Sequence, residues 1–177
     1  MRRAALAAGA LLVAGCAGPV PIERLHVGDP RDARIALEDA HLEGPVAVRI
    51  DHLPPPDPHE DVRAQLLAAA ARGVPALRPR FELVPGEPVL VVAFDQPLGA
   101  DPCSPLPPGE GPLQSVQFAF CADGTPYAAV RAPAEGDLER LYERLARTLF
   151  PDLYAERYGL GLGPLRIGLG GSFGFGR

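Results

Sequence analysis

Two histidines and several carboxylates are concentrated between residues 51 and 61, in a cluster of the kind that could bind a metal ion. His52 and His59 each stand beside acidic residues, and imidazole and carboxylate groups are common Zn²⁺ ligands. However, Asp57 and Glu60 also suit the N-cap and capping-box positions of a helix, with prolines forming a rigid connector before it. The sequence therefore favours a strand-to-helix connector, and His52 and His59 are the residues to test for metal binding.

The serines offer little support for hydrolase chemistry. Ser172 stands in a glycine-rich segment without the preceding strand and following helix that a nucleophile elbow requires. The chain also lacks a His-Glu-x-x-His motif, a phosphate-binding Gly-Lys loop and a dinucleotide fingerprint. We therefore predict no catalytic residue and no cofactor, and expect a protein that is not an enzyme.

The beginning of the chain has the composition of a secretory signal. Arg2 and Arg3 precede an uninterrupted small and apolar run over residues 4–13. A membrane-spanning helix needs about 20 apolar residues, whereas the apolar core of a signal peptide has the length seen here. The run therefore predicts export rather than a membrane span.

The four residues Val13-Ala14-Gly15-Cys16 resemble the lipobox of bacterial lipoproteins. The resemblance implies that Cys16 becomes the first mature residue and carries acyl chains that anchor it in a lipid bilayer. Ala17 is not the aspartate that typically retains such proteins at the inner membrane, so the periplasmic face of the outer membrane is the expected location. The alternative is a plain secretory signal cleaved near Ala14 or Ala17.

Cys103 and Cys121 are the two cysteines that lipidation of Cys16 would leave. Disulfides persist in oxidising compartments, and two remaining thiols allow one bridge. Cys103 lies in a proline-rich loop over residues 99–112, whereas Cys121 ends a predicted strand. They lack the Cys-x-x-Cys spacing of a redox-active pair. A structural disulfide that pins the loop to the strand is predicted.

Composition indicates one acidic domain after the signal peptide. Removal of residues 1–15 leaves 162 of the 177 residues, enough for one compact domain. The formal net charge is −5, and without Arg2 and Arg3 the chain has 15 basic against 22 acidic residues. An acidic balance disfavours nucleic acid as a partner.

Apolar periodicity predicts a small mixed sheet with two helices packed on one face, an α+β fold. Strands are predicted over 46–50, 88–94, 115–121 and 126–131, with weaker extended segments over 21–27 and 80–84, and helices are predicted over 58–73 and 137–150. The segment 34–42 is compatible with either a strand or a helix. Asp123-Gly124 predicts a tight hairpin, and Asp137 is a predicted N-cap.

The element order from Val46 to Pro151 resembles uncharacterised bacterial lipoproteins whose domain is related to the N-terminal domain of TolB. The likeness is carried by a helix ending in Ala-Arg-Gly, a valine-rich strand, a hairpin, and a final helix that runs into Leu149-Phe150-Pro151. It implies a similar fold and an envelope location. It implies no catalytic residues, because none is established for that family.

The C-terminal segment alternates glycine with bulky apolar residues. In an extended chain the apolar side chains would share one face. Such a segment could add to a partner's sheet edge or lie on the membrane, or it could be a weakly ordered terminus. The residues that would make the contact are Leu160, Leu162, Leu165, Ile167, Leu169, Phe173 and Phe175.

The expected organisation is a signal peptide over 1–15, a tether over 16–30, an α+β domain over 31–158 and an apolar tail over 159–177. We expect a membrane-anchored, non-enzymatic envelope lipoprotein that acts through an envelope protein partner or in envelope maintenance. Two alternatives stay open: a periplasmic metal-dependent hydrolase, and a lipoprotein that binds a small ligand.

Overall fold

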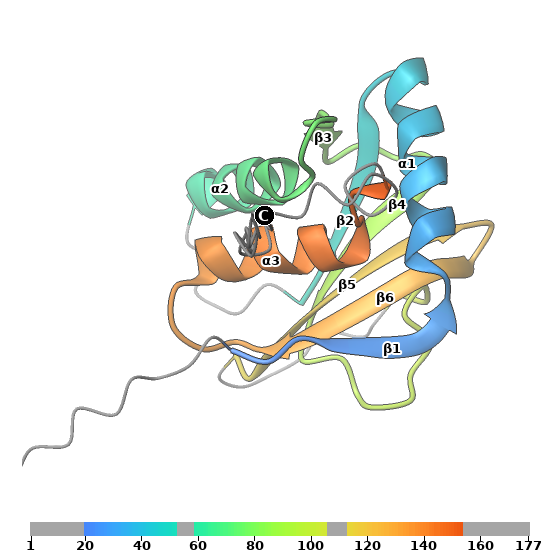
Figure 1. Ribbon diagram of the computed structural model, residues 1–177. Helices are drawn as coiled ribbons and strands as arrows, with labels where there is room; N and C mark the ends of the chain where they lie inside the picture. The colour runs from blue at the N-terminus through green and yellow to red at the C-terminus, as the bar shows by residue number, and fades with distance from the viewer. Residues whose placement is uncertain (1–19, 53–58, 106–112, 154–177) are drawn as a thin grey trace, which may run out of the picture.

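A computed structural model describes residues 20–52, 59–105 and 113–153. This part of the chain forms a six-stranded mixed sheet and three helices (Figure 1). In chain order the elements are β1 (Glu23–Gly28), α1 (Pro30–Glu43), β2 (Val46–Asp51), α2 (His59–Gly73), β3 (Phe81–Glu82), β4 (Val89–Phe94), β5 (Ser115–Ala122), β6 (Thr125–Pro133) and α3 (Leu138–Leu149). The predicted α+β class is confirmed, with three helices in the described residues where the sequence predicted two.

The sheet order is β1-β6-β5-β4-β2-β3. Strands β2 and β4 are parallel, with Ala47 opposite Val89, and α2 lies in the connection between them, as a parallel pair requires. The remaining pairs from β4 through β5 and β6 to β1 are antiparallel. All six residues of β4 are buried, which confirms the prediction that its continuous apolar run is covered on both faces.

Strands β5 and β6 form the hairpin that the sequence predicted. Ala122 pairs with Thr125, and the two residues between them have φ values of 50° at Asp123 and 69° at Gly124. Positive φ at both central positions defines the turn that best matches the twist of paired strands. This hairpin fixes the register of the centre of the sheet.

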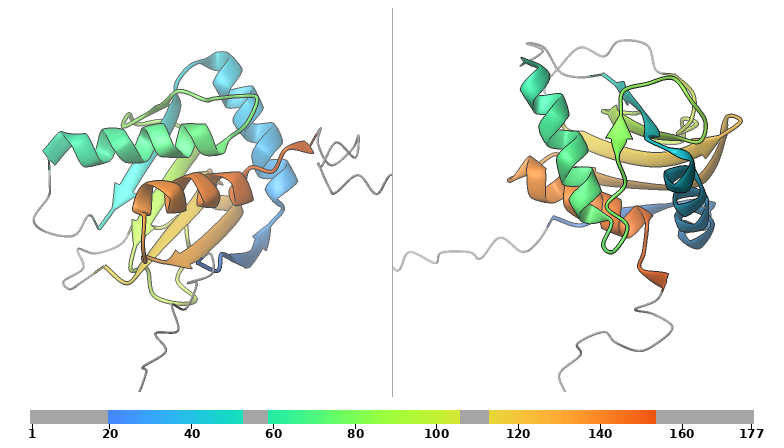
Figure 2. Two further views of the ribbon diagram at one scale, coloured as in Figure 1. Left: turned by 60° about the vertical axis from the view of Figure 1, so that its left-hand side comes forward. Right: turned by 90° about the horizontal axis from the view of Figure 1, so that it is seen from above.

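All three helices cover one face of the sheet (Figure 2). Their buried side chains meet those of alternate strand residues in one apolar core, in which the Phe120 and Phe150 rings pack edge to face with centroids 5.2 Å apart. The helix residues of this core are Ala33, Leu37, Leu66, Ala69, Ala70, Leu141, Tyr142, Leu145, Ala146 and Leu149. The apolar stripe predicted for α3 is the stripe that faces the sheet.

Helix α1 occupies the segment whose periodicity was ambiguous. Asp29 is its N-cap and accepts a hydrogen bond from the Arg31 amide. Arg34 lies on the buried side of the helix, 2% exposed, and its Nε donates to Glu38 at 2.6 Å. A charged residue on the inner face weakens the apolar stripe, so the pattern alone did not identify a helix.

The folded part begins earlier than the predicted boundary at residue 31. Strand β1 lies within the segment 16–30 that we expected to be a tether, and it pairs with β6 through Arg24 and Val130. Just before it, Val20 accepts a hydrogen bond from Arg144 Nη2 at 2.6 Å. The chain is therefore fixed to the domain from Val20 onward.

Helices α2 and α3 approach closely at Gly73. A Cβ at this position would lie 2.3 Å from the backbone oxygen of Glu143. Beside it, Arg72 pairs with Glu143 and Glu139 on α3. Gly73 ends α2, as predicted, and it also permits this contact, which the sequence did not indicate. The predicted N-cap of α2, Asp57, lies outside the described residues.

Candidate functional site

The sheet face opposite the helices is partly covered by the loop that follows β4. Cys103 in this loop is bonded to Cys121 on β5, with an S–S distance of 2.11 Å and a Cα–Cα distance of 5.9 Å. Around the bond lies a second apolar cluster that includes Val91, Ala119 and Ala129. The predicted disulfide is confirmed, and it holds the loop against the apolar half of this face.

Two buried glutamines hold the same loop by their side-chain amides. Gln117 on β5 donates to Gln96 Oε1, and Gln96 Nε2 donates to the Asp101 carbonyl at 2.8 Å. Their exposed fractions are 4% and 1%, so these hydrogen bonds offset the cost of removing amides from water. Arg49 adds a bond from Nη2 to the Cys103 carbonyl at 2.8 Å. The loop is thus a fixed wall.

The Asp101 carboxylate organises the turn within this loop. It accepts hydrogen bonds from the Cys103 amide at 2.9 Å and from the Ser104 hydroxyl at 2.7 Å. The bond from the Cys103 amide, and to a smaller extent that from Ser104, lowers the pKa of Asp101 below its usual value. The carboxylate is therefore a structural acceptor in the turn.

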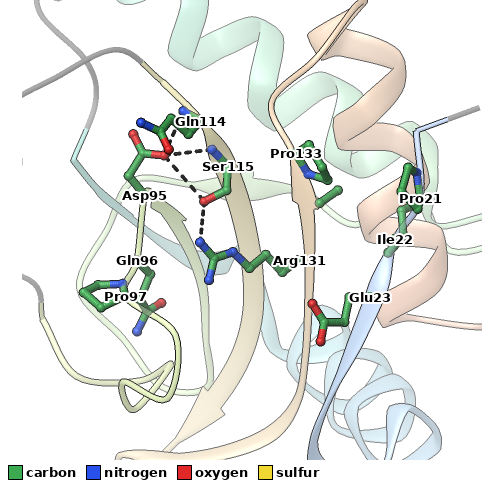
Figure 3. A pocket seen from close by; sticks show the side chains of 11 residues that line it. Pro21, Ile22, Glu23, Asp95, Gln96, Pro97, Gln114, Ser115, Arg131 and Pro133 are labelled. Atoms are coloured by element: carbon green, nitrogen blue, oxygen red, sulfur yellow. Dashed lines mark hydrogen bonds between the residues drawn. The ribbon is translucent and has the colours of Figure 1, made fainter.

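The other half of the face contains an open cavity of about 700 Å³ (Figure 3). Four segments converge on it: the chain entering β1, the loop leaving β4, the start of β5 and the end of β6. Pro21, Pro97 and Pro133 form parts of its walls, and proline fixes the local backbone. Pockets of this volume accommodate small organic ligands.

Arg131 provides the positive charge of this cavity. Its Nη2 donates to Ser115 Oγ at 2.8 Å, and no carboxylate of the described residues forms an ion pair with it. Asp95 Oδ1 accepts from the amides of Gln114 at 2.8 Å and Ser115 at 2.7 Å. Glu23 lies on the other side of β6 from the Asp95 group (Figure 3).

This arrangement is suited to binding. The hydroxyl of Ser115 accepts a hydrogen bond from a cation, whereas an activated serine nucleophile needs a neighbouring base to take its proton. Asp95 Oδ1, the nearest carboxylate oxygen, accepts from two backbone amides and, at a long 3.5 Å, from the Ser115 hydroxyl itself. The described polar groups can therefore orient a ligand.

The structure describes the side chain of one of the two histidines suggested for a metal site. His52 follows β2 with φ 61°, and both of its ring nitrogens are buried without a hydrogen-bond partner among the described residues. The adjacent Asp51 carboxylate pairs with Arg49 at 3.0 Å. Within residues 20–52, 59–105 and 113–153, no group of three potential ligands could hold a metal ion. His59 is the first residue of α2, and its side chain lies outside the described part.

Other predicted features also fall outside the described residues. They are the lipidation site Cys16 and the apolar tail from Leu160 to Phe175. In the described part, no helix has the length and apolar character that crossing a membrane demands. The lipid anchor and the tail contact stay predictions.

The comparisons with known proteins do not identify a family. No protein-family model matches the chain, and no curated protein or solved structure matches it. The resemblance to lipoproteins with a TolB-like domain stays a hypothesis.

The sequence contained one signal for the cavity that our prediction did not use. The alternation of β5 places Val116 and Phe118 beneath the helices, so Gln117 must face the other side. Gln117 pairs with Arg131 on β6. Two adjacent polar residues on a second sheet face indicate a surface that is not simply apolar core.

Proposed function

We propose that this protein is a lipid-anchored binding protein of the bacterial cell envelope, without catalytic activity, and that its binding site is the cavity beside Arg131. The observation that carries the proposal is the preformed cavity itself. Its walls are fixed by prolines and by the disulfide-bonded loop, and its guanidinium has a hydroxyl partner but no carboxylate partner in the described residues. A fixed cavity with a few convergent polar groups is the usual form of a ligand site.

The position of the cavity agrees with an anchor at Cys16. Three residues lie between Cys16 and Val20, where the described chain begins, and the four residue steps from Cys16 to Val20 span at most ~14 Å. Pro21 and Glu23, directly after Val20, line the cavity. A lipidated Cys16 would therefore keep the site close to the membrane surface.

The Cys103–Cys121 bond supports an exported protein. Disulfides are rare in reducing compartments and persist in oxidising ones, including the bacterial periplasm. Export is also what the apolar run before Cys16 predicts. The two observations are independent, because one depends on the folded domain and the other on the first residues.

Lipidation is tested by metabolic labelling with a fatty-acid analogue and membrane fractionation of the native chain and of Cys16→Ser. The native chain should be labelled and sediment with membranes, and Cys16→Ser should lose the label. An unlabelled native chain would contradict the anchor.

The binding site is tested with a photo-crosslinking residue placed at Pro97, on the cavity wall, or at Leu42, on α1. Leu42 is 83% exposed, so it is a matched surface control. We expect one discrete adduct in cells from position 97 that is absent from position 42. The same adducts from both positions, or none from position 97, would contradict a binding role for the cavity.

A further inference from the structure

We propose that the cavity recognises a small zwitterion, a molecule that carries both a free ammonium and a free carboxylate, such as an amino acid or a short peptide with both ends free. This inference rests on the proposed function, because it names the chemistry of that same site. It is carried by two opposite charges that line one cavity and do not pair with each other.

The register of the sheet places these charges side by side. Glu23 on β1 is directly opposite Arg131 on β6, and residues in that relation have Cβ atoms about 5 Å apart. Opposite charges so placed normally attract each other across the strands. Yet within the described residues neither side chain forms an ion pair, and Arg131 instead bonds to Ser115.

A chain of contacts holds Arg131 in this direction. The Ser115 amide is bonded to Asp95 Oδ1 at 2.7 Å, and the Ser115 hydroxyl lies 3.5 Å from the same oxygen. The hydroxyl in turn accepts from Arg131 Nη2 at 2.8 Å. The cation is thus turned toward Ser115 and away from β1 before any ligand arrives (Figure 3), and such preorganisation lowers the entropic cost of binding.

The unused donors and acceptors match a zwitterion. A guanidinium has five N–H donors, and Arg131 uses one on Ser115, so a carboxylate can still bind by two parallel hydrogen bonds. Glu23 can accept the hydrogen bonds of an ammonium. A ligand with a single charge would pair with one of these groups and bring a like charge close to the other, and this repulsion disfavours its binding.

The rest of the cavity accommodates the remainder of such a ligand. Its volume of about 700 Å³ exceeds what the two charged groups require. Pro21, Pro97 and Pro133 supply apolar wall, so a side chain of modest size can be covered there. The class is therefore an amino acid or a short peptide with both ends free.

The test is isothermal titration calorimetry on the full chain in detergent, with four probes: L-alanine, tri-L-alanine, N-acetyl-tri-L-alanine and tri-L-alanine amide. L-Alanine and tri-L-alanine distinguish a free amino acid from a peptide. We expect at least one of these two to bind, and each capped peptide to bind at least about tenfold more weakly than the free peptide if the peptide is the ligand. For L-alanine, the capped controls are N-acetyl-L-alanine and L-alaninamide.

Two variants assign the charges. Arg131→Gln should abolish the preference for a free carboxylate, and Glu23→Gln should abolish the preference for a free ammonium. Arg147→Gln, at an exposed position on α3, should change neither preference. Circular dichroism checks that each variant folds, and the comparison of capped and free probes on the native chain needs no variant at all.

Equal affinity for free and capped probes would overturn the inference, as would no heat from any probe at about 10 mM, well above a weak millimolar Kd. If the adduct from position 97 is still formed in either case, the cavity is a binding site with a ligand of another class. If that adduct is also absent, the proposed function fails together with the inference.

Discussion

Removal of the Cys103–Cys121 disulfide should lower the free energy of unfolding by about 3 kcal/mol. The two cysteines are 18 residues apart in sequence. In the chain-entropy account, a cross-link closing a loop of this size reduces the entropy of the unfolded chain by an amount equivalent to about 3 kcal/mol at 25 °C. The effect therefore arises mainly in the unfolded state, and the folded sheet should keep its circular dichroism spectrum.

The measurement is urea unfolding of three samples: the oxidised native chain, the reduced native chain and the variant Cys103→Ala/Cys121→Ala. The chain has no tryptophan, so circular dichroism is the better signal. Both cysteines are buried, with exposed fractions of 6% and 1%, so alanine is preferable to serine, which would bury a hydroxyl. With a urea slope of about 1–3 kcal/mol per M, the midpoint should fall by about 1–3 M.

Comparison of the oxidised and reduced native chains isolates the bond, since their side chains are otherwise the same. The alanine variant should be somewhat less stable than the reduced chain, because it also loses two buried sulfur atoms. A loss below about 1 kcal/mol on reduction would refute the loop-entropy reasoning. Complete unfolding without urea would refute it in the other direction, by showing that the domain depends on the bond for its fold.

Three further predictions concern single positions and are checked by urea unfolding. Gly28 has φ 63° and a Cβ there would lie 1.9 Å from a backbone oxygen, so Gly28→Ala should lower the free energy of unfolding by more than about 2 kcal/mol. Gly124 has φ 69° with open space around it, so Gly124→Ala should lower it by only about 1 kcal/mol. Equal losses for the two variants would contradict the steric reason. Gln117→Leu removes the donor to the buried Gln96 oxygen and should lower the free energy of unfolding by about 1–3 kcal/mol. The double variant with Gln96→Leu should recover part of that loss. Additive losses from the two substitutions would argue against a coupled pair. Burial raises the pKa of Tyr142 from 10.0 to about 12. The stability that the neutral Tyr142 hydroxyl contributes is therefore complete below pH 10 and decreases as pH rises toward 12, by at most about 1.4 kcal/mol per pH unit. Tyr142→Phe should lose less stability over that range, and a pH dependence of stability equal to that of the native chain would contradict the assignment.

Local signals predicted most of the central elements. The alternation of Val116, Phe118 and Phe120, the Asp123-Gly124 turn and the Asp137 N-cap each depend on neighbouring residues, and the structure confirms them. The disulfide followed from counting cysteines once Cys16 was assigned to lipid. Such features can be predicted because their physical cause lies within a few residues.

The elements that depended on distant contacts were predicted less well. Strand β1 is stabilised by pairing with β6, about a hundred residues later, and the local sequence of β1 does not indicate which strand it pairs with. In α1, the buried Arg34 bonds to Glu38 and reaches the Pro75 carbonyl at 3.5 Å on another segment. A charge that is satisfied by tertiary contacts resembles a solvent-facing residue in the sequence.

The cavity could not be predicted because it is made of four separate segments. Glu23, Asp95, Ser115 and Arg131 come together only through the order of the strands. None of them belongs to a recognisable motif, and His52, which the sequence did single out, does not line the cavity. Polar residues on alternate strand positions show that the second face has a polar half, but not which part of it stays uncovered.

The disulfide determines which part of that face stays open. Cys103 is fixed over Cys121, near the β5–β6 turn, so the loop covers the apolar half and leaves open the cavity that Ser115 and Arg131 line at the opposite end of these strands. Gln96, which lines the cavity, is attached to the same loop through the Asp101 carbonyl. Reduction should therefore loosen one wall of the cavity without changing its charges. Hydrogen exchange of residues 95–105 should become faster on reduction while that of α2 stays constant, and unchanged exchange in the loop would show that the glutamine and Arg49 contacts hold this wall without the bond.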